Sequence, residues 1–344
     1  MNKEVQKQLI IIVLLIGLLS ALLFLYFNKN GFIGRFNPFD DKNKEIELED
    51  IDQGVIVNQS NINLLNYNSN ITITEGGEYI LSGRFSNSVL VKSNEKVTLK
   101  LDNVYIESGI ASAIANIGKG DLVVNILDGT TNTLKDSGSS ELDGCIYSLG
   151  KLFIEGKGKL YIYGNQEEGE GISTTDNDIT INGGEIYVES NDDGLNAGGD
   201  TGGVITVNNG YVYIKASGDG IDSNKDFIMN GGTVYTIGSS VGGDAGIDTD
   251  GKFEINGGVV IALGSDMLQN PNVSSKQRYV SFNLNSKISK NSKISLLDAS
   301  GNDVVSFTAN EDFKTLIISS PKLSSGTYYV YVDGEKTNNF KAIN

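Results

Sequence analysis

The sequence contains no histidine and no tryptophan, and only one cysteine and three prolines among 344 residues. Without histidine, no imidazole is available for acid–base catalysis or for metal binding. The single cysteine, Cys145, cannot form an internal disulfide, and its place in an apolar phrase predicts a buried side chain rather than a reactive thiol. The scarcity of proline suits a chain that uses nearly every backbone N–H in hydrogen-bonded ladders.

Glycine is abundant, with 42 residues, and five of these glycines mark a repeat. One short phrase recurs every 23 to 27 residues, and its glycines are Gly144, Gly171, Gly194, Gly220 and Gly246. A period in the twenties is typical of stacked units, each too small to bury its own apolar face.

A second phrase runs in step with the first and predicts that the stacked units are strands. Its copies are Ile179–Gly184, Ile205–Gly210, Phe227–Gly232 and Phe253–Gly258. Each is a short period-two strand that ends at an Asn-Gly or Gly-Gly turn, and a second strand follows in which Ile or Val alternates with Tyr. The intervals leave no room for a helical crossover between parallel strands. The sequence therefore predicts an all-β fold, a right-handed parallel β-helix over residues 54–268.

The N-terminus predicts a membrane anchor. Residues 9–27 form an apolar run of 19 residues, long enough as a helix to cross a hydrocarbon core of ~30 Å. The run extends well past its only small-residue pair, Ser20-Ala21, so we expect residues 1–27 to be an uncleaved transmembrane helix with the C-terminal domain extracellular. Cleavage would instead give a secreted protein. Residues 28–53 are polar and acidic, which predicts a tether rather than a folded segment.

The C-terminal part departs from the repeat at Pro271, and residues 278–344 predict a small β module. Four segments have strand character: Tyr279–Phe282, Ile294–Leu297, Thr315–Ile318 and Thr327–Val332. The end of a solenoid exposes unpaired backbone groups, so we expect this module to cap the last coil.

Alignment of the coils places acidic side chains in two columns. Equivalent residues of neighbouring coils lie about 4.8 Å apart, and carboxylates at such spacing repel by roughly 3 kcal/mol at an effective dielectric constant of 20. Oxygen ligands on closely spaced turns suit Ca²⁺, which is the cofactor that we expect here. The alternative is that each aspartate only closes its turn. The candidate ligands are Asp192, Asp193, Asn196, Asp219, Asp222, Asp244 and Asp248.

Tyrosines form a further column, consisting of Tyr161, Tyr187, Tyr213 and Tyr235. Their alternation with Ile and Val predicts that the rings lie outside the solenoid. Such a column can serve as a platform for sugar rings, or it can be an aromatic ladder that stiffens the sheet. The net charge of −16 disfavours nucleic acid as a partner, and an acidic glycan would need Ca²⁺ to bridge it to the protein.

These phrases resemble a known family. The Asn-Gly-Gly turns, the phrases Asp192–Asn196 and Asp219–Asp222, and the ending Ile317–Tyr328 are similar to the carbohydrate-binding β-helix domain of clostridial cell-surface proteins. The resemblance covers about residues 85–344. It implies a fold like that of the pectate lyases of polysaccharide lyase family 9, binding of cellulose and acidic pectic sugars, and structural Ca²⁺.

The same resemblance raises the question of catalysis. The family-9 lyases use an Asp-Asp-Gly-x-Asp phrase for catalytic Ca²⁺ and a lysine base, and here Asn196 replaces the last carboxylate while Lys225 is the nearby lysine. Asp226 beside Lys225 favours the charged form of that lysine, which makes it a weak base. We therefore expect a membrane-anchored protein that binds polysaccharide without cleaving it. The alternatives are a calcium-dependent pectate lyase and a non-catalytic surface spacer or adhesin.

Overall fold

The computed structural model describes residues 52–341, except residues 110, 139–141 and 200. The expected anchor, and the tether up to residue 51, lie outside the described residues. Within the described part, no helix is long and apolar enough to cross a membrane, and the only helical element is the short 3₁₀ turn η2 (Leu64–Asn66). The fold of this part is all-β, as the sequence predicts.

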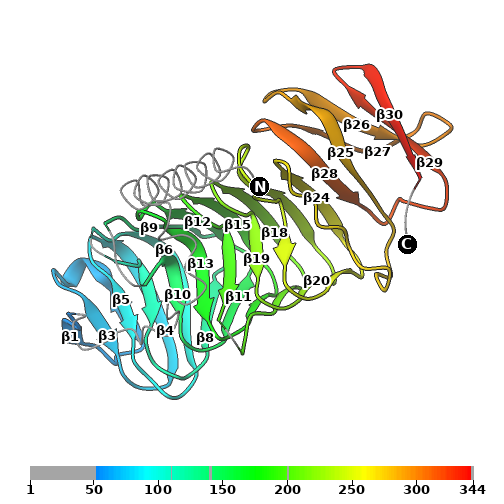
Figure 1. Ribbon diagram of the computed structural model, residues 1–344. Coiled ribbons are helices and arrows are strands. Elements are labelled where there is room, and N and C mark those ends of the chain that lie inside the picture. Colours follow the sequence, from blue (N-terminus) through cyan, green and yellow to red (C-terminus); the bar gives the residue numbers. More distant parts are fainter. Residues whose placement is uncertain (1–51, 110, 139–141, 200, 342–344) are drawn as a thin grey trace, which may run out of the picture. The chain divides into compact units, whose positions relative to one another are not determined.

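The described chain winds into a parallel β-solenoid with three faces. Figure 1 shows the strands of successive coils side by side, from β1 in blue to β24 in yellow. The first face is a nine-stranded parallel sheet with one strand from each coil. Its strands are β1 (Val55–Ile56), β3 (Ile71–Ile73), β5 (Val89–Val91), β7 (Ile114–Asn116), β10 (Gly144–Ser148), β13 (Glu170–Thr175), β16 (Leu195–Gly198), β19 (Ile221–Ser223) and β22 (Asp248–Thr249).

The second and third faces belong to one continuous sheet that turns a corner. The second face holds β8 (Leu122–Ile126), β11 (Leu152–Gly156), β14 (Ile179–Ile181), β17 (Ile205–Val207), β20 (Phe227–Met229) and β23 (Phe253–Ile255). The third face holds β9 (Thr131–Lys135), β12 (Lys159–Gly164), β15 (Glu185–Ser190), β18 (Tyr211–Ala216), β21 (Thr233–Ile237) and β24 (Val259–Gly264). The first coils are simpler, with β2 (Asn61–Asn63), β4 (Gly77–Phe85) and β6 (Val97–Glu107). Strand β6 pairs with both β8 and β9, so it continues through the corner, where Asn103 has a φ of 53°.

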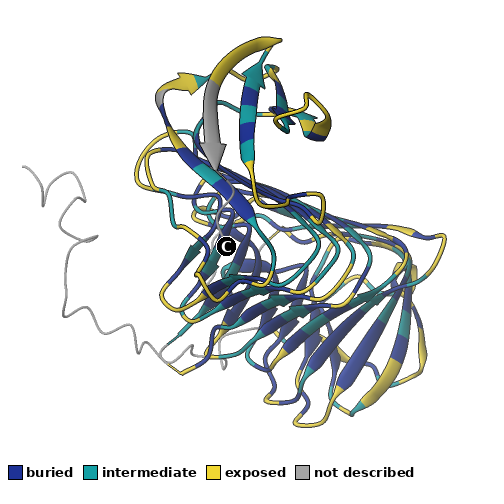
Figure 2. Cartoon of the chain, turned by 90° about the vertical axis from the view of Figure 1, so that its right-hand side faces the viewer, coloured by how far each residue is buried: buried dark blue, intermediate teal, exposed yellow. Residues whose placement is uncertain are grey.

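The interior is a continuous apolar core because alternate side chains of every strand point inward. In β15, Ile186 and Val188 are fully buried while Tyr187 between them is partly exposed. Figure 2 shows the same division, with buried residues along the strands and exposed ones gathered at the turns. Burial of this kind contributes roughly 25 cal/mol per Å² of apolar surface, which is the main stabilising term of a solenoid.

The first copy of the glycine phrase is one residue out of step with the alignment that the sequence suggests. Gly144 pairs with Glu170, and Ile146 pairs with Ile172, so Cys145 rather than Gly144 lies beside Gly171. The register follows the buried isoleucine column, because a slip of one residue would turn apolar side chains outward. Cys145 is buried, as expected, and burial raises the pKa of its thiol.

Six antiparallel strands follow the last coil. They are β25 (Tyr279–Ile288), β26 (Lys293–Leu297), β27 (Asp303–Thr308), β28 (Phe313–Ser319), β29 (Thr327–Val332) and β30 (Glu335–Lys341). Strand β28 pairs with β24 from Thr315↔Gly264 to Ser319↔Val260, so the exposed edge of the last coil is covered. Strands β27, β26, β29 and β30 form a separate four-stranded sheet.

Candidate functional site

The tyrosine column forms on the third face in the register that the sequence predicts. Tyr161 pairs with Tyr187, Tyr187 with Tyr213, and Tyr213 with Tyr235, and Ile261 ends the column. These residues lie on the outward side of β12, β15, β18, β21 and β24. The column brings together side chains from five coils on one surface.

The rings stack on one another along this column. The centroids of Tyr161 and Tyr187 lie 4.8 Å apart with an interplanar angle of 12°, and those of Tyr213 and Tyr235 lie 5.5 Å apart at 17°. Tyr187 and Tyr213 are tilted by 42° at 6.2 Å. The ring faces are thus largely used by neighbouring rings, which is the aromatic ladder. A sugar can meet the ring edges, the hydroxyl groups and the faces that the ladder leaves open.

All four rings lie on the outward side of the solenoid, as predicted, but Tyr235 is only 8% exposed. The end of β27 and the turn that follows it cover this ring: the Phe307 ring packs at 5.6 Å, and the Tyr235 hydroxyl donates to the carbonyl of Thr308 at 3.3 Å. Burial raises the pKa of Tyr235. The same segment reaches Tyr213, whose hydroxyl accepts a bond from Asn310 Nδ2 at 3.0 Å. The open part of the column is therefore Tyr161, Tyr187 and part of Tyr213.

Two further columns of side chains flank the tyrosine column and widen this face. The sequence analysis did not predict them. On one side lies Tyr211, which is exposed and packs 5.7 Å from Tyr187. On the other side Tyr163, Glu189 and Lys215 stack in register. Both columns lie two residues from the main one, which is the period that puts side chains on the same side of a strand. That spacing was the available signal for Tyr163 and Tyr211.

Charged groups on the face are largely held in ion pairs. Lys159 Nζ lies 2.7 Å from Glu185 Oε2. Lys215 Nζ lies 2.9 Å from Glu311 Oε1, which also pairs with Lys290 at 2.9 Å. Such exposed pairs contribute little to stability, about 0–1 kcal/mol each, but they limit the net charge that a ligand meets.

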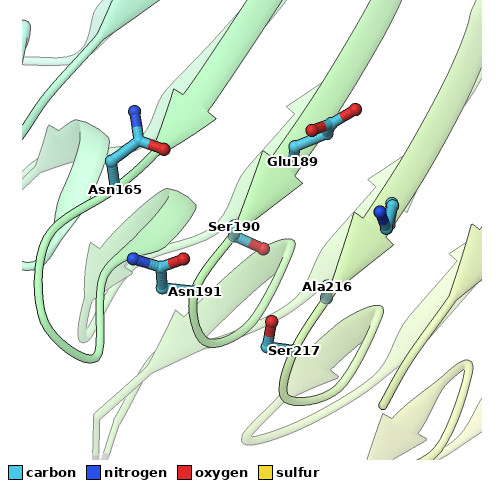
Figure 3. A pocket seen from close by; sticks show the side chains of 7 residues that line it. Asn165, Glu189, Ser190, Asn191, Ala216 and Ser217 are labelled. Carbon is cyan, nitrogen blue, oxygen red and sulfur yellow. The ribbon is translucent and has the colours of Figure 1, made fainter. Parts of the chain in front are cut away.

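A shallow pocket of about 160 Å³ opens at the carboxyl ends of β12, β15 and β18, beside these columns. Figure 3 shows amide, hydroxyl and carboxylate groups around it. The lining residues are Asn165, Glu189, Ser190, Asn191, Lys215, Ala216 and Ser217. Two of the polar groups have fixed positions, because Asn191 Nδ2 donates to the carbonyl of Gln166 at 3.0 Å and Ser190 Oγ donates to that of Asp192 at 3.0 Å. This combination of donors and acceptors is suited to hydroxyl groups.

The acidic columns form at the corner where the chain enters the first face. Asn196 pairs with Asp222, and Asp222 with Asp248. Asp193 and Asp219 follow one another in the backbone ladder, since Gly194 N donates to Asp219 O at 3.0 Å. Their carboxylates also close the corner: Asp193 Oδ1 accepts from the N–H of Asp219 at 2.7 Å, and Asp219 Oδ1 accepts from that of Ala245. This is the turn chemistry that the sequence left open as the alternative to calcium.

Burial disfavours the ionised form of these carboxyl groups and raises their pKa values. The pKa of Asp193 is raised to about 8, first by burial and then by Asp192, and that of Asp219 to about 7, chiefly by burial. Burial also raises the pKa of Asp248. At neutral pH the corner therefore holds protons unless cations neutralise it.

Glu170, which sequence reasoning did not include among the ligands, extends the acidic strip. It is 6% exposed, and burial together with Asp143 and Asp193 raises its pKa well above the usual range. Asn196 Nδ2 donates to Glu170 Oε1, yet Glu170 Oε2 and Asn196 Oδ1 are buried with no partner. Unpartnered buried oxygens are costly and fit a cation or a proton. Among the described residues, however, no three acidic or thiol groups are close enough to hold a metal ion together.

Lys225, the candidate catalytic base, lies at the opposite corner of the first face, after β19. Its side chain is exposed, and its ammonium group donates to the carbonyl of Thr201. This hydrogen bond directs the amino group toward the main chain of the preceding coil, whereas a general base must reach the proton that it abstracts.

Comparison with known proteins now identifies the family. A family model described as "carbohydrate-binding domain-containing protein" matches residues 67–308. The chain belongs to this family. The matched range of this carbohydrate-binding domain includes the tyrosine column, the pocket and the acidic corner. No curated protein matches the chain.

A solved structure is similar to this domain. It is that of "the polysaccharide lyase-like protein from C. thermocellum", a gadolinium derivative, with 25% sequence identity and a TM-score of 0.44. The similarity covers 59% of this chain and 87% of that one.

Proposed function

We propose that this protein binds polysaccharide, cellulose or an acidic pectic glycan, on the third face of its solenoid and does not cleave it. The observation that carries the proposal is the coincidence of an exposed aromatic column and a polar pocket on one face of a carbohydrate-binding domain. Aromatic edges and open ring faces contact the apolar C–H groups of sugars, while the pocket supplies hydrogen bonds to hydroxyls.

We further propose that Ca²⁺ occupies the acidic corner. Supporting this are the unpartnered oxygens of Glu170 and Asn196, together with neighbouring carboxylates whose pKa values are raised by burial. Glu170 and Asn196, with Asp193 as the nearest further carboxylate, would supply the protein ligands, and waters would complete the shell, because Ca²⁺ takes flexible sets of oxygen ligands. The bound ion would neutralise the carboxylates of this corner, which are otherwise neutralised by protons.

The protein is also proposed to be anchored in a membrane through residues 9–27, with the carbohydrate-binding domain outside the cell. The length and composition of that run support this. Fractionation of cells after alkaline carbonate extraction tests it: the full chain is expected in the membrane pellet, and recovery in the medium would show cleavage instead.

Removal of open aromatic rings is expected to weaken binding to neutral glucan. In the double variant Tyr187→Thr/Tyr211→Thr the strands keep residues of high β-propensity, so the solenoid should fold. Truncated aromatic anchors usually cost more than 1 kcal/mol each, which predicts a loss of cellulose retention of about tenfold or more. Depletion isotherms on insoluble cellulose measure it. Phe153→Thr, on the second face, serves as the matched control, and unchanged retention of a folded double variant would place the sugar site elsewhere.

Lyase activity is the alternative that the sequence phrase favours, and we expect no turnover. Elimination from a uronate needs a neutral base at the C5 proton, whereas Lys225 donates to the Thr201 carbonyl. With polygalacturonate and millimolar Ca²⁺ at mildly alkaline pH, absorbance of the unsaturated product should stay flat. Accumulation of product that Lys225→Ala abolishes would make the protein an anchored lyase.

A further inference from the structure

The aromatic column of the third face extends further toward the N-terminus than the four tyrosines, and one small residue interrupts it. Tyr105 pairs with Thr133, and Thr133 pairs with Tyr161. Arg84 precedes Tyr105 in the same column. The order along the solenoid is therefore arginine, tyrosine, threonine, and then the tyrosine ladder.

Tyr105 and Tyr161 lie on either side of Thr133, and each of the two rings has a contact on its face that points away from Thr133. The guanidinium of Arg84 lies 4.0 Å from the centroid of the Tyr105 ring. Tyr187 stacks on Tyr161 at 4.8 Å, and it is the only aromatic ring in contact with Tyr161 in the described part of the chain. The sides of Tyr105 and Tyr161 that face each other meet no second ring.

The spacing of these two tyrosines suits a sugar ring. They are two rungs apart, or roughly 9.6 Å at 4.8 Å per rung. Contact between carbon atoms needs about 3.5–4.0 Å on each side of an inserted ring. Thr133, which is only partly buried, leaves space where a tyrosine would continue the ladder.

A positive charge lies beside this position. Lys135, two residues after Thr133 on the same side of β9, places its Nζ 5.7 Å from the Tyr105 ring centroid and 5.0 Å from that of Tyr163. The Lys135 ammonium thus rests on tyrosine rings and forms no ion pair with a carboxylate of the described residues. It retains donors for a ligand.

The nearby charges leave a net positive centre in an acidic protein. Arg84 pairs with Glu107 at 3.6 Å, and the Tyr105 hydroxyl donates to the same carboxylate at 2.8 Å. Glu107 is also the register neighbour of Lys135 on the adjacent strand, so this one carboxylate is shared by two cations, and Arg84, Lys135 and Glu107 together carry one net positive charge. Exposed charges further away than about 8 Å are largely screened at physiological salt, so the overall charge of −16 does not decide binding here.

We infer that Tyr105, Thr133, Tyr161 and Lys135 form a subsite for one uronate residue of a polysaccharide, with its ring between the tyrosines and its carboxylate on Lys135. This inference rests on the proposed function and names a substrate class for it. It gives acidic sugars a contact that needs no bridging Ca²⁺, separate from the pocket beside Glu189 and Lys215.

Retention on immobilised polygalacturonate in EDTA tests the subsite, with cellulose retention measured in parallel. Wild-type protein is expected to bind both. Lys135→Gln should lose about tenfold or more in binding to polygalacturonate, the range for a hydrogen bond to a charged group, and keep its binding to cellulose. Thr133→Tyr should continue the ladder, fold normally, and lose the same polygalacturonate binding.

The matched controls are Lys157→Gln, at an exposed turn, and Thr206→Tyr, on the outward side of the second face. Circular dichroism melts verify folding of every variant. If the wild type binds polygalacturonate and both Lys135→Gln and Thr133→Tyr bind it equally well, the subsite is overturned. Wild-type retention on cellulose only would also overturn the subsite. Neither result would overturn the proposed function. Failure of the wild type to bind any polysaccharide would overturn the proposed function together with the subsite.

Discussion

Gly194→Ala is expected to lower the melting temperature of the protein by about 2–12 °C. A Cβ at Gly194 would overlap Cγ2 of Ile214 and lie 2.5 Å from the carbonyl oxygen of Gly220. Both neighbours are held by the core and the ladder, so neither can move away freely. Overpacking of this kind costs typically 1–3 kcal/mol, and 1 kcal/mol shifts the midpoint by roughly 2–4 °C in a domain of 150–250 residues.

Gly243→Ala, in the turn before the last copy of the phrase, is the matched control. A Cβ there would meet no atom within 4 Å, so its midpoint should stay within about 1 °C of wild type. Differential scanning calorimetry of the two variants measures the difference. Equal midpoints would show that the repeated glycine serves the turn only and not the close approach of two faces.

Without metal, the protein is expected to lose stability as the pH rises from about 4 to about 8. The folded-state pKa values of Asp193 and Asp219, about 8 and about 7, lie above the ordinary value of 3.8. A raised carboxyl pKa means that the folded state binds more protons than the unfolded state within this window, so stability falls with pH there. Below pH 4 both states are protonated, and the stabilisation is complete.

Calcium should restore the stability that the protein loses when these carboxyl groups are deprotonated. A ligand that binds only the folded state adds RT ln(1 + [L]/Kd), about 2.7 kcal/mol at a hundredfold excess over Kd, or a rise of about 5 °C or more in the midpoint. We expect this rise at pH 8.5 and a much smaller one at pH 5, where protons compete. Melting curves with EDTA or Ca²⁺ at both pH values measure it, with Asp193→Asn as the variant that removes a ligand charge.

An unchanged midpoint after chelation at pH 8.5 would reduce the acidic corner to turn chemistry. A fall of stability with pH that Ca²⁺ does not offset would support buried, protonated carboxylates without a metal site. Asp178→Asn, on an exposed ion pair with Lys151 at 2.8 Å, is a control for the removal of one carboxylate from the surface.

The sequence predicts much of the central solenoid because each coil repeats the same apolar pattern. The pairing of Tyr187 with Tyr213 and of Asn196 with Asp222 follows directly from aligning the phrases. The one-residue shift at Gly144 does not follow from that alignment. Cys145 lies where the next coil has glycine, and only the buried isoleucine column fixes the register. In the long strand β6 the turn signal is only Asp102-Asn103, without the glycine of the later coils, so the first coils were harder to recognise.

Features that depend on contacts between distant parts of the chain could not be predicted from the sequence. Nothing near Tyr235 in the chain indicates that Phe307 and Thr308 cover it, since the two segments are about 70 residues apart. The burial of Glu170 likewise comes from neighbouring coils rather than from its own phrase. Local patterns determine which side chains point outward, whereas the packing of the C-terminal strands determines which outward side chains remain exposed.

Binding of polysaccharide by the third face is tested most directly by retention of the protein on a panel of insoluble cellulose, immobilised polygalacturonate and an unrelated resin. Residues 52–344 form the test protein, within the compact unit Asp50–Asn344. We expect retention on cellulose that Tyr187→Thr/Tyr211→Thr loses, and retention on polygalacturonate that Lys135→Gln loses, with both unaffected in Phe153→Thr. Retention no greater than on the unrelated resin, or equal retention of all these variants, would contradict the account.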